Sequence, residues 1–265
     1  MMRKTLIILA VQFVMLAALL TLALDSFEHA QTETTLGVNR WGYRGAVAKQ
    51  RAYDETRIMV VGGTSAFEPQ RVLLDTVTAR LRYMVQQWVT LDRGPVTGVN
   101  IAALRLPRGA YAERLRRFSY LRPDAICVVV DLAPAGEAPV EGLLARTTGY
   151  VPALRPVTAI DQWLGSVTGR AATANDAAES IGEVVSTASA LAPTVIAIPQ
   201  PSSEDERVTR DVVRRTLRVY AGNARVKIVE LIDGPEVVVR GVPQPAAAAQ
   251  IEPALSALLR ERSTS

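Results

Sequence analysis

The sequence predicts an α/β protein: a three-layer α/β/α sandwich with a central five-stranded parallel sheet, preceded by one N-terminal transmembrane helix. From residue 57 onward, short apolar runs of β type alternate with longer amphipathic segments. That alternation is typical of βαβ crossovers, which build parallel sheets covered by helices on both faces. Ahead of it, a long apolar run follows the N-terminus almost at once.

The N-terminal run, Thr5–Leu24, has the length and composition of a membrane span. Twenty residues at the helical rise cover about 30 Å, the thickness of the hydrocarbon layer. Arg3 and Lys4 precede the run, and Asp25 and Glu28 follow it. The positive-inside rule therefore predicts that the N-terminus lies inside and the rest of the chain outside.

A cleaved signal peptide is the competing interpretation of this run. Its apolar core would be about 7–15 residues long and would end at a small-x-small site. The run here is longer, and the stretch LALDSFEHA after it offers no convincing site. We therefore favour an uncleaved, single-pass anchor in a bacterial-type cytoplasmic membrane. Under either interpretation the remainder of the chain works outside the cytoplasm.

The predicted organisation has three parts. Residues 1–30 form the anchor or signal peptide, and residues 31–56 form a linker and lead-in segment. Residues 57–262 form the α/β domain, which carries an irregular insertion at about 134–175. In an open α/β sheet, ligands bind at the carboxyl ends of the strands. The insertion is thus either a lid over such a site or an ordinary surface excursion, with short helices around Val140–Arg146 and Ala159–Leu164.

Five strands and two amphipathic helices are predicted from the apolar pattern. Several strands are continuous apolar runs, as expected when both faces of a parallel sheet are covered. The resulting sheet is of the flavodoxin-like kind. The predicted strands are Arg57–Val61, Val96–Ala102, Ala125–Asp131, Thr194–Pro199 and Arg225–Leu231. The apolar helix stripes are Leu73, Val77, Leu81, Met84 and Trp88 in one helix, and Val208, Val212, Thr216 and Tyr220 in the other.

Composition argues against several classes of function. The net charge of +4 is modest, and the arginines are scattered among acidic residues, so no nucleic-acid partner is expected. Cys127, the only cysteine, lies in an apolar run and is expected to be a buried core residue. His29, the only histidine, is expected to be a solvated linker residue. No metal site, phosphate-binding loop or other cofactor site is predicted.

Four segments in order resemble a known family. Arg57–Glu68 reads RIMVVGGTSAFE, an apolar strand that runs into two glycines, two hydroxyl residues and the start of a helix. LGVNRWGYRG (Leu36–Gly45) precedes it, PDAICVVVDL (Pro123–Leu132) follows, and RGVPQPAAAAQIEPALSALL (Arg240–Leu259) comes last. Together they resemble blocks I, III and V of the SGNH (GDSL-type) esterases and acyltransferases, and the segment that precedes block I in many membrane-anchored members. The resemblance covers nearly all of residues 36–260 and implies the same sandwich fold.

The resemblance implies a serine nucleophile, a histidine base oriented by an aspartate, and oxyanion donors from the serine N–H, a glycine and an asparagine. At block I, Gly63 is followed by Thr64 at the nucleophile position, with Ser65 beside it. These two are the candidate nucleophiles. The alternative, which we favour, is that both hydroxyls cap the following helix.

The other blocks depart from the family pattern. At block II the glycine is missing and Asn100 lies at the strand end, where a structural role is favoured over a donor role. At block III Asp131 replaces the asparagine donor and would oppose a developing oxyanion. At block V Arg240 stands at the aspartate position and Pro243 at the histidine position. The resemblance therefore implies a cleft formed by Gly63, Asn100, Asp131 and Arg240 without the family's catalytic machinery.

Three functions fit these residues. The first is a membrane-anchored, extracytoplasmic domain that has lost hydrolysis. It would bind a glycan or acyl-ester ligand, or an acyltransferase or other envelope protein, in cell-envelope glycan or lipid acylation. Arg240 would suit an anionic ligand, or it would pair with Asp131 or Glu68. The second is an active esterase or O-acyltransferase that uses Thr64 or Ser65 with Asp131 or Glu68 as base. The third is a structural envelope protein that only makes protein contacts.

Overall fold

The computed structural model describes residues 2–88, 94–104, 106–133, 142–148, 150–168, 177–232, 237–239, 242–244 and 246–263. The chain divides into two compact units. The anchor unit comprises Met1–Gly42 and Val140–Gly169, and the sheet unit comprises Tyr43–Pro139 and Arg170–Ser265.

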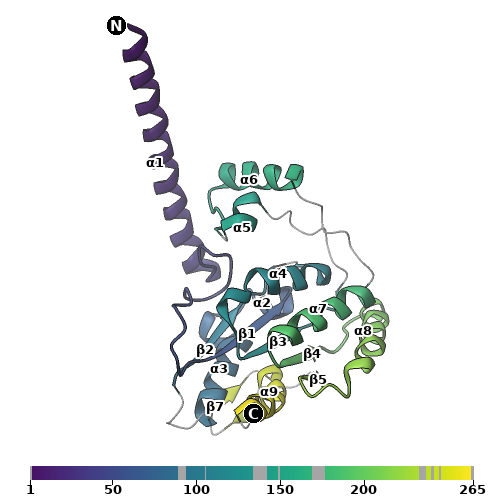
Figure 1. Ribbon diagram of the computed structural model, residues 1–265. Helices are drawn as coiled ribbons and strands as arrows, with labels where there is room; N and C mark the ends of the chain where they lie inside the picture. Colours follow the sequence, from purple (N-terminus) through teal and green to yellow (C-terminus); the bar gives the residue numbers. More distant parts are fainter. Residues whose placement is uncertain are drawn as a thin grey trace. The chain divides into compact units, whose positions relative to one another are not determined.

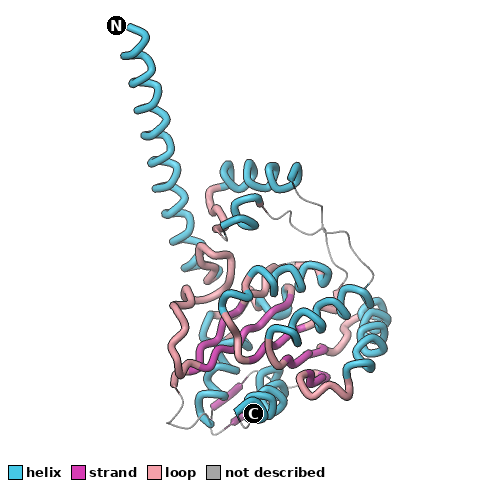
Figure 2. Tube along the Cα trace, in the orientation of Figure 1, coloured by secondary structure: helices cyan, strands magenta, loops and turns pink. Residues whose placement is uncertain are grey.

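The sheet unit is built on the predicted five-stranded parallel sheet, which is confirmed (Figures 1 and 2). The strand order β2-β1-β3-β4-β5 is the flavodoxin-like order. The predicted strands agree with the observed ones to within two residues at each end. The strands are β1 (Thr56–Gly62), β2 (Val96–Asn100), β3 (Ala125–Val129), β4 (Thr194–Ile198) and β5 (Val226–Glu230). A short antiparallel pair, β6 (Val237–Val239) and β7 (Val242–Gln244), lies outside this sheet.

Helices cover both faces of the sheet. On one face α3 and α9 contact each other, and α9 also contacts β3, β4 and β5. On the other face α7 packs against α4 and α8. The helices are α2 (Thr64–Phe67), α3 (Val77–Trp88), α4 (Tyr111–Arg117), α7 (Ala177–Leu191), α8 (Glu204–Leu217) and α9 (Ala246–Ser263), with 3₁₀ turns η1 (Leu73–Asp75), η2 (Arg108–Ala110), η3 (Ser119–Leu121) and η4 (Arg218–Tyr220).

The central strands are buried because helices cover both of their faces. All five residues of β3 and of β4 are buried, and Cys127 has no exposed surface, as predicted. In α3 the predicted stripe is correct at Val77, Leu81 and Met84. It is wrong at Leu73, which is 39% exposed, because η1 and a break at Thr76 precede the helix.

The stripe predicted for α8 is out of phase. Val208, expected in the core, is 59% exposed, whereas Val213 and Leu217 are buried. The helix is therefore rotated by about one position from the predicted face. Ser203 caps it, with its side chain accepting a hydrogen bond from the Glu206 N–H at 3.3 Å.

The anchor unit contains α1 (Met2–Leu36), α5 (Leu143–Thr148) and α6 (Arg155–Thr168). Among the described residues α1 is the one helix long and apolar enough to cross a membrane. Its 35 residues span about 52 Å, well beyond the apolar run. The two short helices expected in the insertion are present, but α6 has 14 residues and is longer than the six predicted.

Asp25, the first residue after the apolar run of α1, ties this helix to the segment ahead of α6. Its Oδ1 atom accepts hydrogen bonds from the N–H groups of Ala153 and Leu154 at 2.8 and 2.7 Å, and its Oδ2 atom accepts one from the Tyr150 hydroxyl. The His29 ring packs edge-on against the Tyr150 ring. The His29 side chain is only 14% exposed, so the expectation that His29 is a solvated linker residue is wrong.

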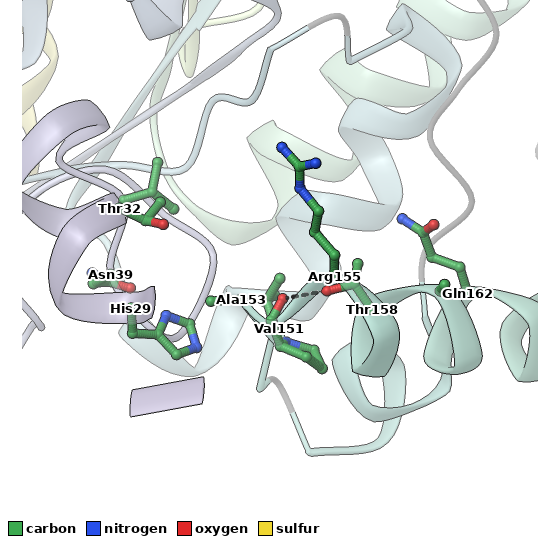
Figure 3. Close-up of a pocket in the computed structure, with 11 residues that line it drawn as sticks. His29, Thr32, Asn39, Val151, Ala153, Arg155, Thr158 and Gln162 are labelled. Carbon is green, nitrogen blue, oxygen red and sulfur yellow. Dashed lines mark hydrogen bonds between the residues drawn. The ribbon is translucent and has the colours of Figure 1, made fainter. Parts of the chain in front are cut away.

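A cavity of about 360 Å³ lies within the anchor unit, between the last turns of α1 and the start of α6 (Figure 3). His29 and Thr32 line it from α1, and Arg155, Thr158 and Gln162 line it from α6. The Thr158 hydroxyl donates a hydrogen bond to the Pro152 carbonyl at 2.9 Å, which holds the segment ahead of α6 against the first turn of this helix.

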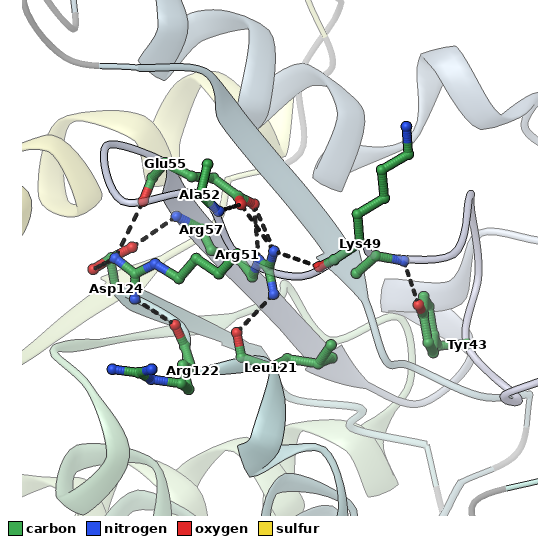
Figure 4. Close-up of polar contacts among 10 residues, drawn as sticks. Tyr43, Lys49, Arg51, Ala52, Glu55, Arg57, Leu121, Arg122 and Asp124 are labelled. Atoms are coloured by element: carbon green, nitrogen blue, oxygen red, sulfur yellow. Dashed lines mark hydrogen bonds and ion pairs between the residues drawn. The ribbon is translucent and has the colours of Figure 1, made fainter.

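At the amino ends of the strands, a buried ion-pair network holds the start of β1 in place (Figure 4). The Arg57 guanidinium, 3% exposed, donates two hydrogen bonds to the Glu55 carboxylate and one to the Leu121 carbonyl, each at 2.9 Å. The Arg57 N–H donates to Asp124, which also accepts from Arg51. Buried charges are tolerated here because each has a partner.

We predict that Arg57→Leu lowers the free energy of unfolding by about 3–5 kcal/mol, because it leaves the Glu55 carboxylate buried without its partner. Chemical denaturation of the full-length protein in detergent measures this loss. Arg207→Leu is the matched control. It removes an arginine from an ion pair whose two side chains are 68% and 76% exposed, and should cost less than about 1 kcal/mol. Equal losses in the two variants would contradict the prediction.

Candidate active site

The predicted site residues of the sheet unit meet at the carboxyl edge of the sheet. Strands β1 and β3 are neighbours, with Gly62 paired with Val129. The turn after β1 and the segment after β3 therefore leave the sheet side by side. This brings Gly63, Thr64 and Ser65 to Asp131.

The Asp131 carboxylate sits on the first turn of α2. It accepts hydrogen bonds from the N–H groups of Thr64 at 2.7 Å and Ser65 at 3.2 Å, and from the Ser65 hydroxyl. The Gly63 N-cap position has no side chain to cap the helix. The prediction that the two hydroxyls cap α2 is therefore wrong: the cap is the carboxylate of a residue 67 positions away in sequence from Thr64.

Gly63 is required because Asp131 approaches the backbone so closely. A Cβ atom at this position would lie 2.1 Å from the Asp131 Oδ2 atom and 3.0 Å from the Leu106 carbonyl oxygen. Real Cβ atoms do not approach other atoms this closely, so any side chain here would displace the carboxylate. Close approach is therefore sufficient to explain a glycine at this position.

Two residues that the sequence did not single out lie beside Asp131, and one of them, Arg108, binds its main chain. Arg108 donates to the carbonyl oxygens of Asp131 at 2.5 Å and Ala133 at 3.2 Å. Tyr111 is fully buried beside this segment. Burial first, and then the negative charge of Asp131, raise the pKa of Tyr111, so its phenol stays neutral. No motif in the sequence pointed to either residue: Arg108 begins η2 and Tyr111 begins α4, in the segment that follows β2.

Asn100 braces α2 and does not face Asp131. Its Nδ2 atom donates to the Ala66 carbonyl at 2.9 Å, and its Oδ1 atom accepts from the Ala102 N–H at 3.0 Å. The side chain is 3% exposed. Both ends of the amide are therefore engaged in holding the backbone.

Arg44 clamps the other end of α2. Its guanidinium donates to the carbonyl oxygens of Phe67, Glu68 and Arg71, and lies 5.0 Å from the centre of the Phe67 ring. Its own N–H donates to the Asn100 carbonyl at 2.8 Å. The signal was present in the sequence: Arg44 is the arginine of the WGYRG stretch that resembles the segment ahead of block I.

Glu68, proposed as an alternative base, points away from the hydroxyls. It ends α2 in a left-handed conformation with a φ of 51°. Its carboxylate accepts from the Val77 N–H at 2.6 Å and pairs with Arg71 at 3.1 Å. Burial raises the pKa of Glu68, and the Val77 N–H and the Arg71 and Arg44 charges only partly oppose this.

Three further predicted residues are not among those that the described part of the sheet unit brings to Asp131. Arg240 lies outside the described residues. Pro243 pairs with Val238 in the β6–β7 hairpin. His29 belongs to the anchor unit, where it contacts Asp25 and Tyr150. Within the described ranges, no group of three or more His, Cys, Asp and Glu side chains is arranged to hold a metal ion.

Two backbone N–H groups, those of Thr64 and Ser65, already donate to the Asp131 carboxylate in this site. The N–H of Thr64, which stands where the resembled family has its serine donor, faces an Asp131 oxygen at hydrogen-bond distance, and so does the N–H of Ser65. The Ser65 hydroxyl donates to Asp131, which is a contact of the kind that a nucleophile makes with a base.

Comparisons with known proteins find similar solved structures only at low similarity. No protein-family model and no curated protein matches the chain. An α/β hydrolase enzyme from the metagenome of Lake Arreo is 14% identical, with a TM-score of 0.43, over 77% of this chain and 95% of that one. A member of the lipolytic G-D-S-L family from Veillonella parvula is 11% identical, with a TM-score of 0.40, over 78% and 97%. At these values the similarity does not bear on the site or its chemistry.

We predict that Asp131→Asn destabilises the sheet unit by about 1–3 kcal/mol, because an amide replaces a charged acceptor at the helix N-terminus. Thermal or chemical denaturation of the full-length protein measures the change. Asp211→Asn, at an exposed position on α8, is the control and should change little. An Asp131→Asn variant as stable as this control would show that the carboxylate does not hold α2.

A second prediction concerns pH. Because the folded-state pKa of Glu68 lies above its ordinary value of 4.5, its contribution to stability is complete below that value. The contribution is lost as pH rises through the raised pKa. Glu68→Gln keeps an acceptor for Val77 but cannot ionise. The stability of the wild type relative to this variant should therefore fall as pH increases above about 4.5. A difference that is constant or grows with pH would contradict the assignment.

Proposed function

We propose that the chain is a membrane-anchored, extracytoplasmic domain of the SGNH type that does not hydrolyse esters. It would serve binding or scaffolding in cell-envelope glycan or lipid acylation. One observation carries the loss of hydrolysis: the Asp131 carboxylate occupies the N–H groups of Thr64 and Ser65. The family assignment is supported by the four sequence segments and by the observed strand order.

The electrostatic argument follows from the charge of Asp131. An acyl-transfer site needs unoccupied donors aimed at an oxygen that becomes negative in the transition state. Here the donors already hold a negative oxygen. A substrate oxyanion would have to displace it, or to develop its charge beside it, and like charges at contact distance repel. The site thus favours its own carboxylate over a reacting ester.

The membrane placement rests on α1 and its flanking charges. Ile8–Leu36 holds the apolar stretch, and Arg3 and Lys4 precede it, which supports an N-terminus inside and a domain outside. A signal sequence remains the alternative to an anchor. The basic contribution of Arg240 to an anionic-ligand site stays a prediction, as do the glycan or acyl-ester ligand and the acyltransferase or other envelope protein as partner.

An active esterase or O-acyltransferase is the second candidate, and one contact favours it. The Ser65 hydroxyl donates a hydrogen bond to the Asp131 carboxylate, which is the contact that a nucleophile makes with its base. In this alternative Ser65 is the favoured nucleophile because its hydroxyl makes this contact, and Thr64 is the other candidate. Asp131 would then have to leave the backbone donors before an oxyanion could occupy them.

Hydrolysis of p-nitrophenyl acetate by the full-length protein in detergent micelles separates the two candidates. We expect the wild type to turn over no faster than Thr64→Ala, Ser65→Ala or Asp131→Ala. Ser186→Ala, an exposed serine on α7, controls for preparation. Turnover that is lost in both Ser65→Ala and Asp131→Ala, but kept in Ser186→Ala, would overturn the non-hydrolytic proposal and identify the pair as nucleophile and base.

A further inference from the structure

Helix α6 carries an apolar stripe that the described residues of the anchor unit leave exposed. Ile160, Trp163 and Val167 are 60%, 63% and 66% exposed, and Pro156 is exposed in the same row. Their spacing of four, three and four residues places all four on one face of the helix. In α5 of the same unit, Leu144 is 39% exposed.

The face of α6 that points into the unit carries the buried Asp161, with Val157 and Leu164 half-buried on either side of it. Asp161, 4% exposed, accepts a hydrogen bond from the Leu144 N–H at 2.7 Å and so ties α6 to α5. A Cβ atom on Gly142 would lie within 1.7 Å of the same carboxylate. Asp161 is the one acid in α6, so its apolar face is free of negative charge.

The start of α6 is fixed at the end of the apolar run of α1. Leu24 closes that run, and the next residue, Asp25, accepts the N–H groups of Ala153 and Leu154. Helix α6 begins at the following residue, Arg155. It runs across the direction of α1 and not along it (Figure 1). A helix that starts where a span leaves the hydrocarbon and runs across it lies at the level of the membrane surface.

We infer that α6 is an interfacial helix, with Pro156, Ile160, Trp163 and Val167 immersed in the headgroup and upper acyl region of the bilayer that α1 crosses. Tryptophan is enriched at this depth because its ring is both apolar and polar. Arg155, exposed at the start of the helix, is placed to reach lipid phosphates. Because α1 already holds the unit at the membrane, α6 needs little affinity of its own. The inference rests on the proposed membrane anchor.

Spin labels on single introduced cysteines test the inference in the full-length protein. The native Cys127 does not interfere, because it is fully buried and burial raises the pKa of its thiol to about 12. The protein is reconstituted in vesicles of phosphatidylcholine and phosphatidylglycerol. Collisions of each label with oxygen, which partitions into the bilayer, are compared with collisions with a water-soluble nickel chelate.

Three positions separate the outcomes. Ile160→Cys reports on the stripe, Ser166→Cys on the exposed polar side of the same helix, and Leu16→Cys on the middle of α1. We expect the label at position 160 to shift toward the oxygen-rich, chelate-poor environment of position 16. The label at 166 should remain accessible to the chelate.

Chelate access at position 160 equal to that at 166, with position 16 still in the bilayer, would overturn the inference and leave the anchor intact. Chelate access at position 16 as well would overturn both. Loss of collisions with both reagents at position 160, with dipolar broadening between labels, would show that a second copy of the chain covers the stripe, which also overturns the inference.

Discussion

The contact between Asp131 and the first turn of α2 organises the sheet unit. A four-residue helix has no stability of its own, since a first turn fixes many dihedral angles for few hydrogen bonds. The carboxylate supplies acceptors for two N–H groups that the helix leaves without partners. Because β1 and β3 are adjacent, the cap joins two neighbouring strand ends. This contact explains why residue 63 is a glycine and why the N–H groups of Thr64 and Ser65 already have an acceptor.

Arginine side chains that donate to backbone carbonyls hold loops at both ends of the strands. Arg44 binds the carbonyls at the end of α2, Arg108 binds those after β3, and Arg57 reaches Leu121 and Lys49 at the opposite edge of the sheet. A planar guanidinium can satisfy several carbonyl oxygens at once, which a lysine cannot do in the same geometry. The scatter of the arginines argued only against a nucleic-acid partner, but at these three positions the arginines have a structural role.

The sequence predicted the sheet well because its strands are continuous apolar runs that differ sharply from the helices between them. The sequence also predicted most of the buried stripe of α3. It misplaced the buried face of α8, because Val212 and Val213 are adjacent and the helical repeat alone does not decide which of them is buried.

At the site, the sequence predicted that Asp131 and Thr64 lie at the same edge of the sheet, because the carboxyl ends of parallel strands lie together. It could not predict that the carboxylate would cap α2, because that contact depends on side-chain direction after the strand has ended. Nor could local pattern indicate that His29 packs against Tyr150, 121 residues further along the chain.

The same contact decides what this edge of the sheet can do. An oxyanion site needs donors that are unsatisfied in the resting protein, which costs stability that binding or catalysis has to offset. Here the Asp131 carboxylate satisfies the N–H groups of Thr64 and Ser65. Gly63 leaves room for the carboxylate, and Arg108 binds the main-chain carbonyl of Asp131. Under our proposal that the site does not hydrolyse esters, a histidine base would have no acyl-transfer step to serve. That agrees with a chain whose single histidine, His29, belongs to the anchor unit.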